Sequence, residues 1–392
     1  MPDGGPLQGL RIVEMVGIGP APFAAMVLAD LGAEVIRIDR IEPTGTGIAR
    51  PPRFDLVSRG KRTVKLDLKR PEAVACVLDL VASADALIEG FRPGVMERLG
   101  LGPEICHAVN PRLVYGRLTG WGQNGPLAQR AGHDINYLAL SGALDMIGPE
   151  NGPPIPPLNL VADYAGGSLI LVSGMLAALL HAKRSGEGQV VDAAMVDGVA
   201  LLATAMTGLR ASGIHTGPRG TNILDGGAPY YGVYPCADGK FLSIGPIESK
   251  FRAILLDGLG FDAHAFPDMD DQSRWPDARR LIGARLRERP RDEWVALFEE
   301  TDACVAPVLA LEDAPLHPHN VARGSYATIG DVMQAVPAPR FERTPPSLPE
   351  APEELPGNAG AATLEGWGID GTRIAHLIEI GALGAPQHGR TM

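Results

Sequence analysis

The sequence has 392 residues, which is enough for two or three domains and a large apolar core. Its formal net charge of -11 argues against a general nucleic-acid-binding or anionic-membrane surface, so an anionic ligand would need a local group of cations. The 49 glycines and 35 prolines exceed ordinary usage without reaching the level of a disordered chain, which indicates a folded protein rich in loops.

Four cysteines lie far apart in the sequence and form no metal-ligand spacing, so we expect buried free thiols in a reducing compartment; they are Cys76, Cys106, Cys236 and Cys304. The longest apolar run, 169–180, is shorter than the roughly 20 residues of a membrane span and predicts a buried helix. The termini carry neither a secretion pattern nor a peroxisomal address. We therefore expect a cytoplasmic protein with no membrane partner.

Strand and helix patterns alternate through the first two hundred residues. Strands are predicted at 11–16, 34–39, 63–68, 85–91, 113–118 and 189–193, and helices at 22–31, 71–83, 164–183 and 195–209. Such alternation predicts an α/β fold with a doubly wound, Rossmann-like parallel sheet, whose ligands bind at the carboxyl ends of the strands.

A second, smaller region follows a polar, glycine-rich linker at 210–227. It begins with two β runs, 230–235 and 241–244, joined through Asp238-Gly239, which is a hairpin signal. Helices are predicted at 248–259, 276–287, 291–300 and 371–380, a strand at 304–309 and a proline-rich linker at 343–357. We therefore predict a large domain at 1–209, the linker at 210–227, a small α+β domain at 228–325, and a return segment at 326–392 that completes the large domain.

Two features of the large domain suggest anionic ligands. Gly17-Ile18-Gly19 follows the first strand and Asp39 ends the second, as in a dinucleotide site, but Pro22 replaces the third glycine. The run 58–65, with Lys69 and Arg70 after it, is strongly basic and could gather phosphates, although such a run is usually a solvated surface.

A histidine and a carboxylate thirty residues apart are the strongest candidates for catalysis. His133 follows Gly132, and Asp163 precedes the predicted helix at 164–183, where an ordinary helix N-cap is the simpler interpretation. A histidine and a carboxylate can also act as paired acid and base on two faces of one carbon, once their pKa values are tuned. The residues alone leave both interpretations open.

Ordered motifs along most of the chain make it similar to the family III CoA-transferases, and within them to the α-methylacyl-CoA racemases. These motifs include 9–14 with 17–20, 32–40, 88–95, 119–123, 132–137, 191–198, 224–231 and 245–248. Transferases of the family use an aspartate matching Asp163 as a nucleophile that forms an acyl anhydride, and generally lack a histidine matching His133. Racemases carry that histidine and a glutamate matching Glu248, and this chain has all three.

The resemblance implies an isomerase of fatty-acyl metabolism that epimerises C2 of 2-methylacyl-CoA thioesters through an enolate. His133 and Asp163 would each exchange the α-proton of one enantiomer, and Glu248 would orient the imidazole. N–H groups at the start of the Asp163 helix could stabilise the enolate. The alternative that the resemblance leaves open is a CoA-transferase with Asp163 as the nucleophile.

The same resemblance implies where CoA binds and how the chain assembles. The implied CoA contacts are Arg40, Leu66, Asp67, Leu68, Lys69, Gly90, Phe91, Arg92, Arg98, Gly132, Asp134 and Tyr137. CoA would be part of the substrate, and no metal or other cofactor is expected. The implied assembly is an interlocked homodimer, with each site between the large domain of one subunit and the small domain of the other.

Overall fold

The fold was analysed in a computed structural model, which describes residues 4–42, 45, 47–353 and 359–384. The chain forms two compact units. Unit 1 comprises 1–141, 158–202 and 322–392, and unit 2 comprises 142–157 and 203–321. The loop 142–157, which the sequence places in the large domain, belongs to unit 2, where Arg219 donates to the carbonyls of Asp145 and Gly152.

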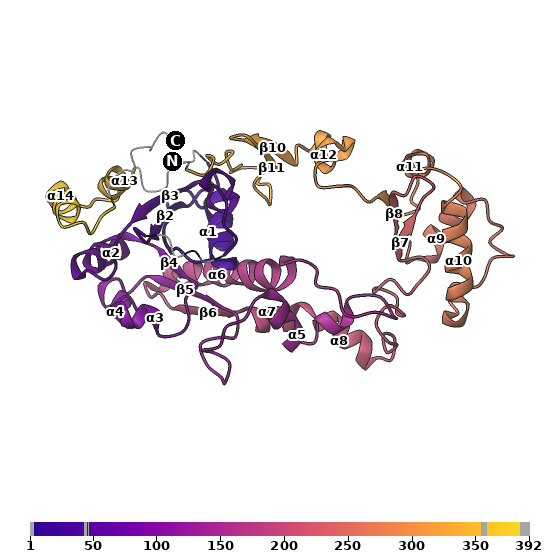
Figure 1. The fold of residues 1–392 in the computed structure, drawn as a ribbon, viewed down its shortest axis with the longest axis horizontal. Helices are drawn as coiled ribbons and strands as arrows, with labels where there is room; N and C mark the ends of the chain where they lie inside the picture. Colours follow the sequence, from indigo (N-terminus) through magenta and orange to yellow (C-terminus); the bar gives the residue numbers. More distant parts are fainter. Residues whose placement is uncertain (1–3, 43–44, 46, 354–358, 385–392) are drawn as a thin grey trace. The chain divides into compact units, whose positions relative to one another are not determined.

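A six-stranded sheet in the order β3-β2-β1-β4-β5-β6 forms the centre of unit 1 (Figure 1). Every neighbouring pair in it is parallel, so the predicted doubly wound sheet is confirmed. The strands are β1 (Arg11–Met15), β2 (Glu34–Asp39), β3 (Lys61–Lys65), β4 (Ala86–Glu89), β5 (Val114–Thr119) and β6 (Val190–Ala194). The chain order reverses between β1 and β4, which is where doubly wound sheets bind ligands.

Helices of unit 1 connect these strands and bury the faces of the sheet. They are α1 (Pro20–Asp30), α2 (Pro71–Ser83), α3 (Val95–Arg98), α4 (Pro103–Val109), α5 (Asp134–Leu140), α6 (Ile170–Ser185) and α7 (Met195–Leu202). Prolines in the first turn of α1, α2 and α4 stand where a missing N–H costs no helical hydrogen bond. The predicted helix 195–209 is instead two helices, because α7 ends where unit 1 gives way to unit 2.

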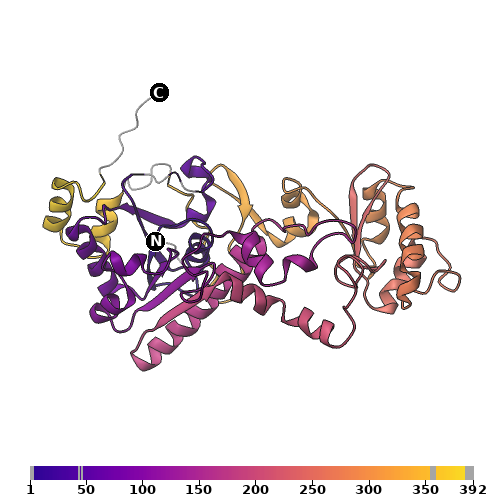
Figure 2. The same cartoon turned by 60° about the horizontal axis from the view of Figure 1, so that its bottom comes forward.

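The C-terminal part of the chain returns to the sheet of unit 1. Helices α13 (Gly360–Gly366) and α14 (Gly371–Glu379), yellow in both views, lie beside the indigo and purple N-terminal half (Figures 1 and 2). Leu364, Trp367 and Leu377 share one apolar core with Val64 and Val77. The return segment also carries the antiparallel pair β10 (Tyr326–Ile329) and β11 (Val332–Ala335). Residues 354–357 of the predicted linker and the tail after 384 lie outside the described residues.

Unit 2 has its own small core. Strands β7 (Gly232–Pro235), β8 (Phe241–Ile244) and β9 (Val305–Pro307) form an antiparallel sheet. Helices α9 (Ser249–Gly258), α10 (Trp275–Leu286) and α11 (Arg291–Phe298) pack on it, and Trp294 and Phe298 are buried there. The remaining helices are α8 (Thr204–Ala211) and α12 (Pro318–Arg323), the latter at the boundary of the units.

One helical stretch is longer than the sequence suggests. A π-helix at Leu160–Leu169, called here the π segment, runs directly into α6. Together they are 26 residues long and apolar enough to cross a membrane, and 44% of the most apolar window is buried within the protein. Core helices of soluble proteins meet the same criterion. The apolar run 169–180 is only part of this helix, so the prediction that the helix here is too short to span a bilayer is wrong.

Three of the four cysteines are buried as predicted. Cys304 is exposed and adopts a positive φ of 53°.

Candidate functional site

Most of the predicted CoA contacts follow the carboxyl ends of three strands, which lie on both sides of the point where the strand order reverses. Arg40 follows β2, Leu66 to Lys69 follow β3, and Gly90 to Arg92 follow β4, with Arg98 ending α3 just beyond. Parallel strands bring these segments to the same edge of the sheet. The sheet thus collects residues that are up to 58 positions apart in the sequence.

Four cations at this edge are exposed, and no described residue forms an ion pair with any of them. They are Arg40, Lys69, Arg92 and Arg98. An exposed cation without an acidic partner remains available to a phosphate oxygen. In a chain of net charge -11, this edge supplies the local positive charge that an anionic ligand needs.

The backbone N–H groups expected to contact CoA are partly in use. Those of Leu66 and Asp67 donate to the carbonyls of Asp39 and Ala382, and that of Phe91 donates to Glu89 Oε2 at 2.7 Å. Leu66 is fully buried and bridges to Leu383. These three N–H groups therefore anchor the loops internally, and the expected contacts of Leu66, Asp67 and Phe91 with CoA stay a prediction that would use their other atoms.

Two cations of the basic run 58–65 are not available to a phosphate. Arg59 and Lys61 are buried, and their charges face Asp30 and Glu14, with Lys61 Nζ donating to Glu14 Oε2 at 2.7 Å. Burial lowers the pKa of Lys61 to about 8, against the opposing charge of Glu14. Arg59 and Lys61 are buried because β3 begins at Lys61, two residues before the predicted start, whereas Arg62, the next residue of β3, is exposed.

A buried ion-pair network fixes the loop after β4. Arg117, on β5, donates through Nε to Glu89 Oε1 at 2.9 Å and through Nη1 to Glu97 Oε1 at 2.9 Å. Burial raises the pKa of Glu89, while the Phe91 N–H and the Arg117 charge oppose that rise. Because Glu89 and Glu97 flank the segment 90–96, Arg117 holds the backbone that carries Arg92 and Arg98.

His133 occupies the N-cap of α5 with an extended backbone, and its N–H donates to Asn136 Oδ1 at 3.0 Å. The residue is exposed. Glycines make room for the rings beside it: a Cβ on Gly132 would lie 2.9 Å from Trp121 and Tyr137, and one on Gly120 would lie 2.1 Å from the Tyr137 ring. The sequence Gly132-His133-Asp134 is thus shaped by close packing against two aromatic side chains.

Asp163 lies in the first turn of the π segment, whose N-cap is Asn159. The expectation that Asp163 itself caps the helix is therefore wrong, since the helix starts four residues earlier. Asn159 Nδ2 donates to Asp163 Oδ2 at 3.2 Å. π-Helical turns inside α-helices are rare and occur frequently at functional sites.

The Asp134 carboxylate joins these two elements. Its Oδ2 accepts the backbone N–H groups of both Ala162 and Asp163, each at 2.9 Å. Its Oδ1 is buried without a hydrogen-bond partner among the described residues. These two N–H groups are consequently not available to an enolate, so the expectation that the start of the Asp163 helix supplies the oxyanion donors is wrong for both.

The charges of this cluster act on one another. Burial raises the pKa of Asp163, Asp134 adds to the rise, and the Asn159 hydrogen bond and the nearby His133 oppose it. Burial and the charge of Asp163 raise the pKa of Tyr137 to about 12, so its hydroxyl stays protonated at neutral pH. The structure therefore brings His133, Asp134, Tyr137 and Asp163 together. The raised pKa of Asp163 favours the protonated form of its carboxyl more than in an ordinary aspartate, which suits an acid–base group.

The glycine loop after β1 does not suit a dinucleotide. Gly19 is the N-cap of α1, and a Cβ built on it would lie 3.8 Å from Asp163 Oδ2. A pyrophosphate placed there would face a carboxylate. It would also lack two helix-terminal donors, because Pro20 and Pro22 have no N–H.

Glu248 belongs to unit 2, where it is the exposed N-cap of α9. Burial raises the pKa of Cys304, and the charge of Glu248 adds to this rise. The two side chains are therefore neighbours. Its predicted contact with His133 stays a prediction.

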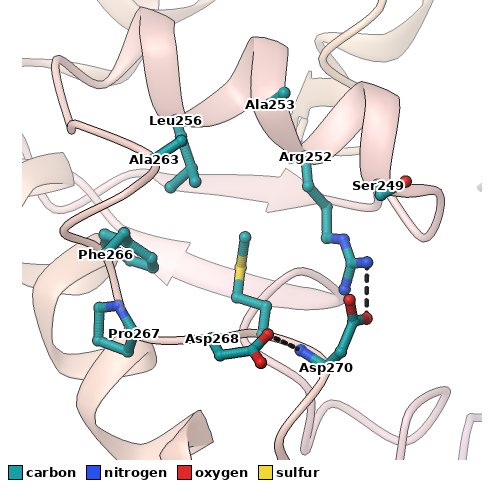
Figure 3. Close-up of a pocket in the computed structure, with 10 residues that line it drawn as sticks. Ser249, Arg252, Ala253, Leu256, Ala263, Phe266, Pro267, Asp268 and Asp270 are labelled. Atoms are coloured by element: carbon teal, nitrogen blue, oxygen red, sulfur yellow. Dashed lines mark hydrogen bonds and ion pairs between the residues drawn. The ribbon is translucent and has the colours of Figure 1, made fainter.

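A small pocket in unit 2 contains none of the predicted site residues. Its lining includes Leu256, Phe266 and Met269. Two further lining residues, Arg252 and Asp270, form an ion pair, with the Arg252 guanidinium 2.7 Å from Asp270 Oδ1 (Figure 3). Arg252 also lies 4.7 Å from the centre of the Tyr230 ring. Its cation is thus engaged within the protein.

Two residues that hold the candidate site were missed from the sequence. Asn159 lies four positions before Asp163, and this helical spacing could have identified it. Arg117 lies in an apolar strand, and its partners become visible only when β4 and β5 are paired.

Comparison with known proteins adds relatives that match over almost the whole chain. The family model described as CoA-transferase family III matches residues 7–359. The α-methylacyl-CoA racemase of Mus musculus is 45% identical over 360 residues, covering 92% of each chain, and that of Homo sapiens is 43% identical over 376 residues, covering 95% of this chain and 96% of its own. The solved structure of a CaiB/BaiF family protein from Brucella suis is 27% identical, covers 93% of this chain and 100% of its own, and superposes with a TM-score of 0.81.

Proposed function

The chain belongs to CoA-transferase family III, and we propose that within this family it is an α-methylacyl-CoA racemase. The reaction is the epimerisation of C2 in a 2-methylacyl-CoA thioester by 1,1-proton transfer. The observation that carries the proposal is the junction of α5 and the π segment, where Asp134 holds the backbone of Asp163 beside His133.

In the proposed mechanism, one base removes the C2 proton and the electron pair moves into the thioester carbonyl, forming an enolate. The conjugate acid of the other base then delivers a proton to the opposite face of C2. His133 and Asp163 serve as the two bases, one for each enantiomer. A carboxyl whose pKa is raised by burial gives up and recovers a proton more evenly than an ordinary aspartate, so it can work in both directions.

The CoA part of the substrate would bind at the carboxyl edge of the sheet. The exposed side chains of Arg40, Lys69, Arg92 and Arg98, which form no ion pair within the described part of the chain, would meet its phosphates, and Gly90 allows close approach of the chain. CoA enters as part of the substrate, and the proposed chemistry uses no metal or redox cofactor. A chelator such as EDTA should therefore leave the activity unchanged.

An interlocked homodimer and a cytoplasmic location are parts of the same proposal. Large apolar side chains on α5, the π segment and α7 are exposed in the single chain, among them Leu140, Leu160, Leu169 and Leu202. Such a group of exposed apolar side chains is typical of an interface. Sedimentation of the purified protein at a monomer mass would contradict the dimer.

Deuterium exchange separates the proposed function from its alternative. Incubation of one enantiomer of a 2-methylacyl-CoA in heavy water should give deuterium at C2 and loss of optical purity, without any free carboxylate. If the enzyme instead moves CoA to a free carboxylate, and C2 gains no deuterium, it is a transferase with Asp163 as its nucleophile.

A further inference from the structure

Ser168 is completely buried between two backbone carbonyls. Its Oγ lies 2.7 Å from the Pro20 carbonyl oxygen of α1 and 2.9 Å from the Asp163 carbonyl oxygen of the π segment. A hydroxyl has one hydrogen to donate, so both carbonyls share a single donor. Neither the proposed mechanism nor the CoA contacts use this residue.

The hydroxyl connects the start of α1 with the π segment, and these two elements also approach each other at the Asp163 carboxyl. Gly19, next to Pro20, is the residue whose added Cβ would lie 3.8 Å from Asp163 Oδ2. Ser168 thus ties the backbone of Asp163 to the helix start that its side chain approaches. One residue farther along, the ring of Tyr164 stacks on Phe23 of α1, with centroids 4.4 Å apart.

The other side of the π segment is in close contact with α7. A Cβ on Gly198 would lie 1.7 Å from the Gly166 carbonyl oxygen, and one on Gly167 would lie 2.8 Å from the Met195 side chain. The segment is therefore packed backbone to backbone on this side. On the side of α1 the Ser168 hydroxyl and the Phe23–Tyr164 stack are among the contacts that hold it.

We infer that Ser168 is a positioning residue that sets the location of the Asp163 carboxyl through the π segment. A π turn is less common than an α turn and persists where its surroundings hold it. Without the hydroxyl, the segment loses its hydrogen-bonded tie to α1, and the carboxyl moves relative to the substrate carbon. This inference rests on the proposed function.

The test compares Ser168→Ala with Ser173→Ala. Ser173, in α6, makes a similar bond from its Oγ to the Leu169 carbonyl at 2.9 Å, but it is exposed and has no link to α1. Ser168→Ala should lower kcat by about 10- to 100-fold, the range that a misplacement near 1 Å produces. KM should stay within about twofold, because the CoA contacts are untouched. Ser168→Cys, which keeps a weak donor in a somewhat larger side chain, should recover part of kcat.

The readout specific for positioning is the asymmetry between enantiomers. Deuterium wash-in should fall most for the enantiomer that Asp163→Asn also impairs, while wash-in from the other enantiomer falls less. Equal losses from both enantiomers, or a Ser168→Ala enzyme as active as Ser173→Ala, would overturn the inference.

Amide hydrogen exchange of the ligand-free protein tests the tie independently of activity. Ser168→Ala should speed exchange across 160–169 by about tenfold, the effect of losing one hydrogen bond, and Ser173→Ala should not. Unchanged exchange in Ser168→Ala would refute the tie even if wild-type protein showed no racemisation. Absence of wild-type deuterium wash-in would refute the proposed function alone.

Discussion

Replacement of Arg117 by methionine should destabilise unit 1 and weaken binding of CoA esters. Arg117 makes three side-chain hydrogen bonds to two carboxylates, at 2.9 Å to Glu89 and at 2.9 and 3.2 Å to Glu97. Glu89 is only 1% exposed, so the substitution leaves a buried carboxylate without its cation. Breaking a buried pair in this way costs about 3–5 kcal/mol.

The pH dependence of this loss follows from Glu89. Burial raises its pKa, and removal of Arg117 takes away two opposing effects, so the pKa rises further. An acid with a higher pKa in the folded state than in the unfolded state binds more protons when folded, so stability falls as pH rises through that window. The deficit of Arg117→Met should therefore be smaller at pH 5 than at pH 8, and Glu89→Gln should recover part of it.

Urea unfolding of the variants at both pH values measures this deficit, with Arg62→Ala as the control. Arg62 pairs with Glu350 on the surface, where the two side chains are 47% and 61% exposed, so its loss should cost less than about 1 kcal/mol. KM for the CoA ester should rise in Arg117→Met, because the loop at 90–96 loses its anchor. A deficit near that of Arg62→Ala, or one independent of pH, would refute the reasoning.

Two further predictions concern the cluster itself. Gly120→Ala places a Cβ 2.1 Å from the Tyr137 ring, so it should lower kcat/KM by about tenfold or more. The control is Gly208→Ala in α8, where an added Cβ would meet nothing within 4 Å and kcat/KM should not change. Steady-state kinetics of both variants test this prediction. Asn159→Ala removes a hydrogen bond that lowers the pKa of Asp163, so that pKa should rise. The acidic limb of the pH–rate profile should then move to higher pH for one enantiomer. An acidic limb that stays in place would exclude Asp163 as the titrating base.

The parallel sheet could be predicted from the sequence because it depends on local patterns. Apolar strands such as 34–39 alternate with helices whose ends are marked by proline and glycine, so the local sequence indicates both the strands and the helices. The candidate bases could also be proposed from the sequence, since the motif around His133 and the position of Asp163 match those of the family. Their surroundings were not.

What failed depends on contacts between distant parts of the chain. Lys61 was included in a run that could gather phosphates, because its buried partner, Glu14, lies 47 residues away in the sequence. The N-cap interpretation of Asp163 failed because the helix begins at Leu160, in a π segment that packs closely against α7. The expected contact of Asp134 with CoA stays a prediction, but the sequence did not show that its carboxylate accepts the N–H groups of a segment 28 residues later. Such partners cannot be deduced from local spacing.

The most direct test of the two-base mechanism compares His133→Ala with Asp163→Asn in heavy water, using each pure enantiomer of a 2-methylacyl-CoA. The mechanism predicts opposite preferences: each variant loses deuterium wash-in mainly from the enantiomer whose proton its missing base removes, while CoA esters still bind. Wash-in from both enantiomers at wild-type rates in either variant would contradict it.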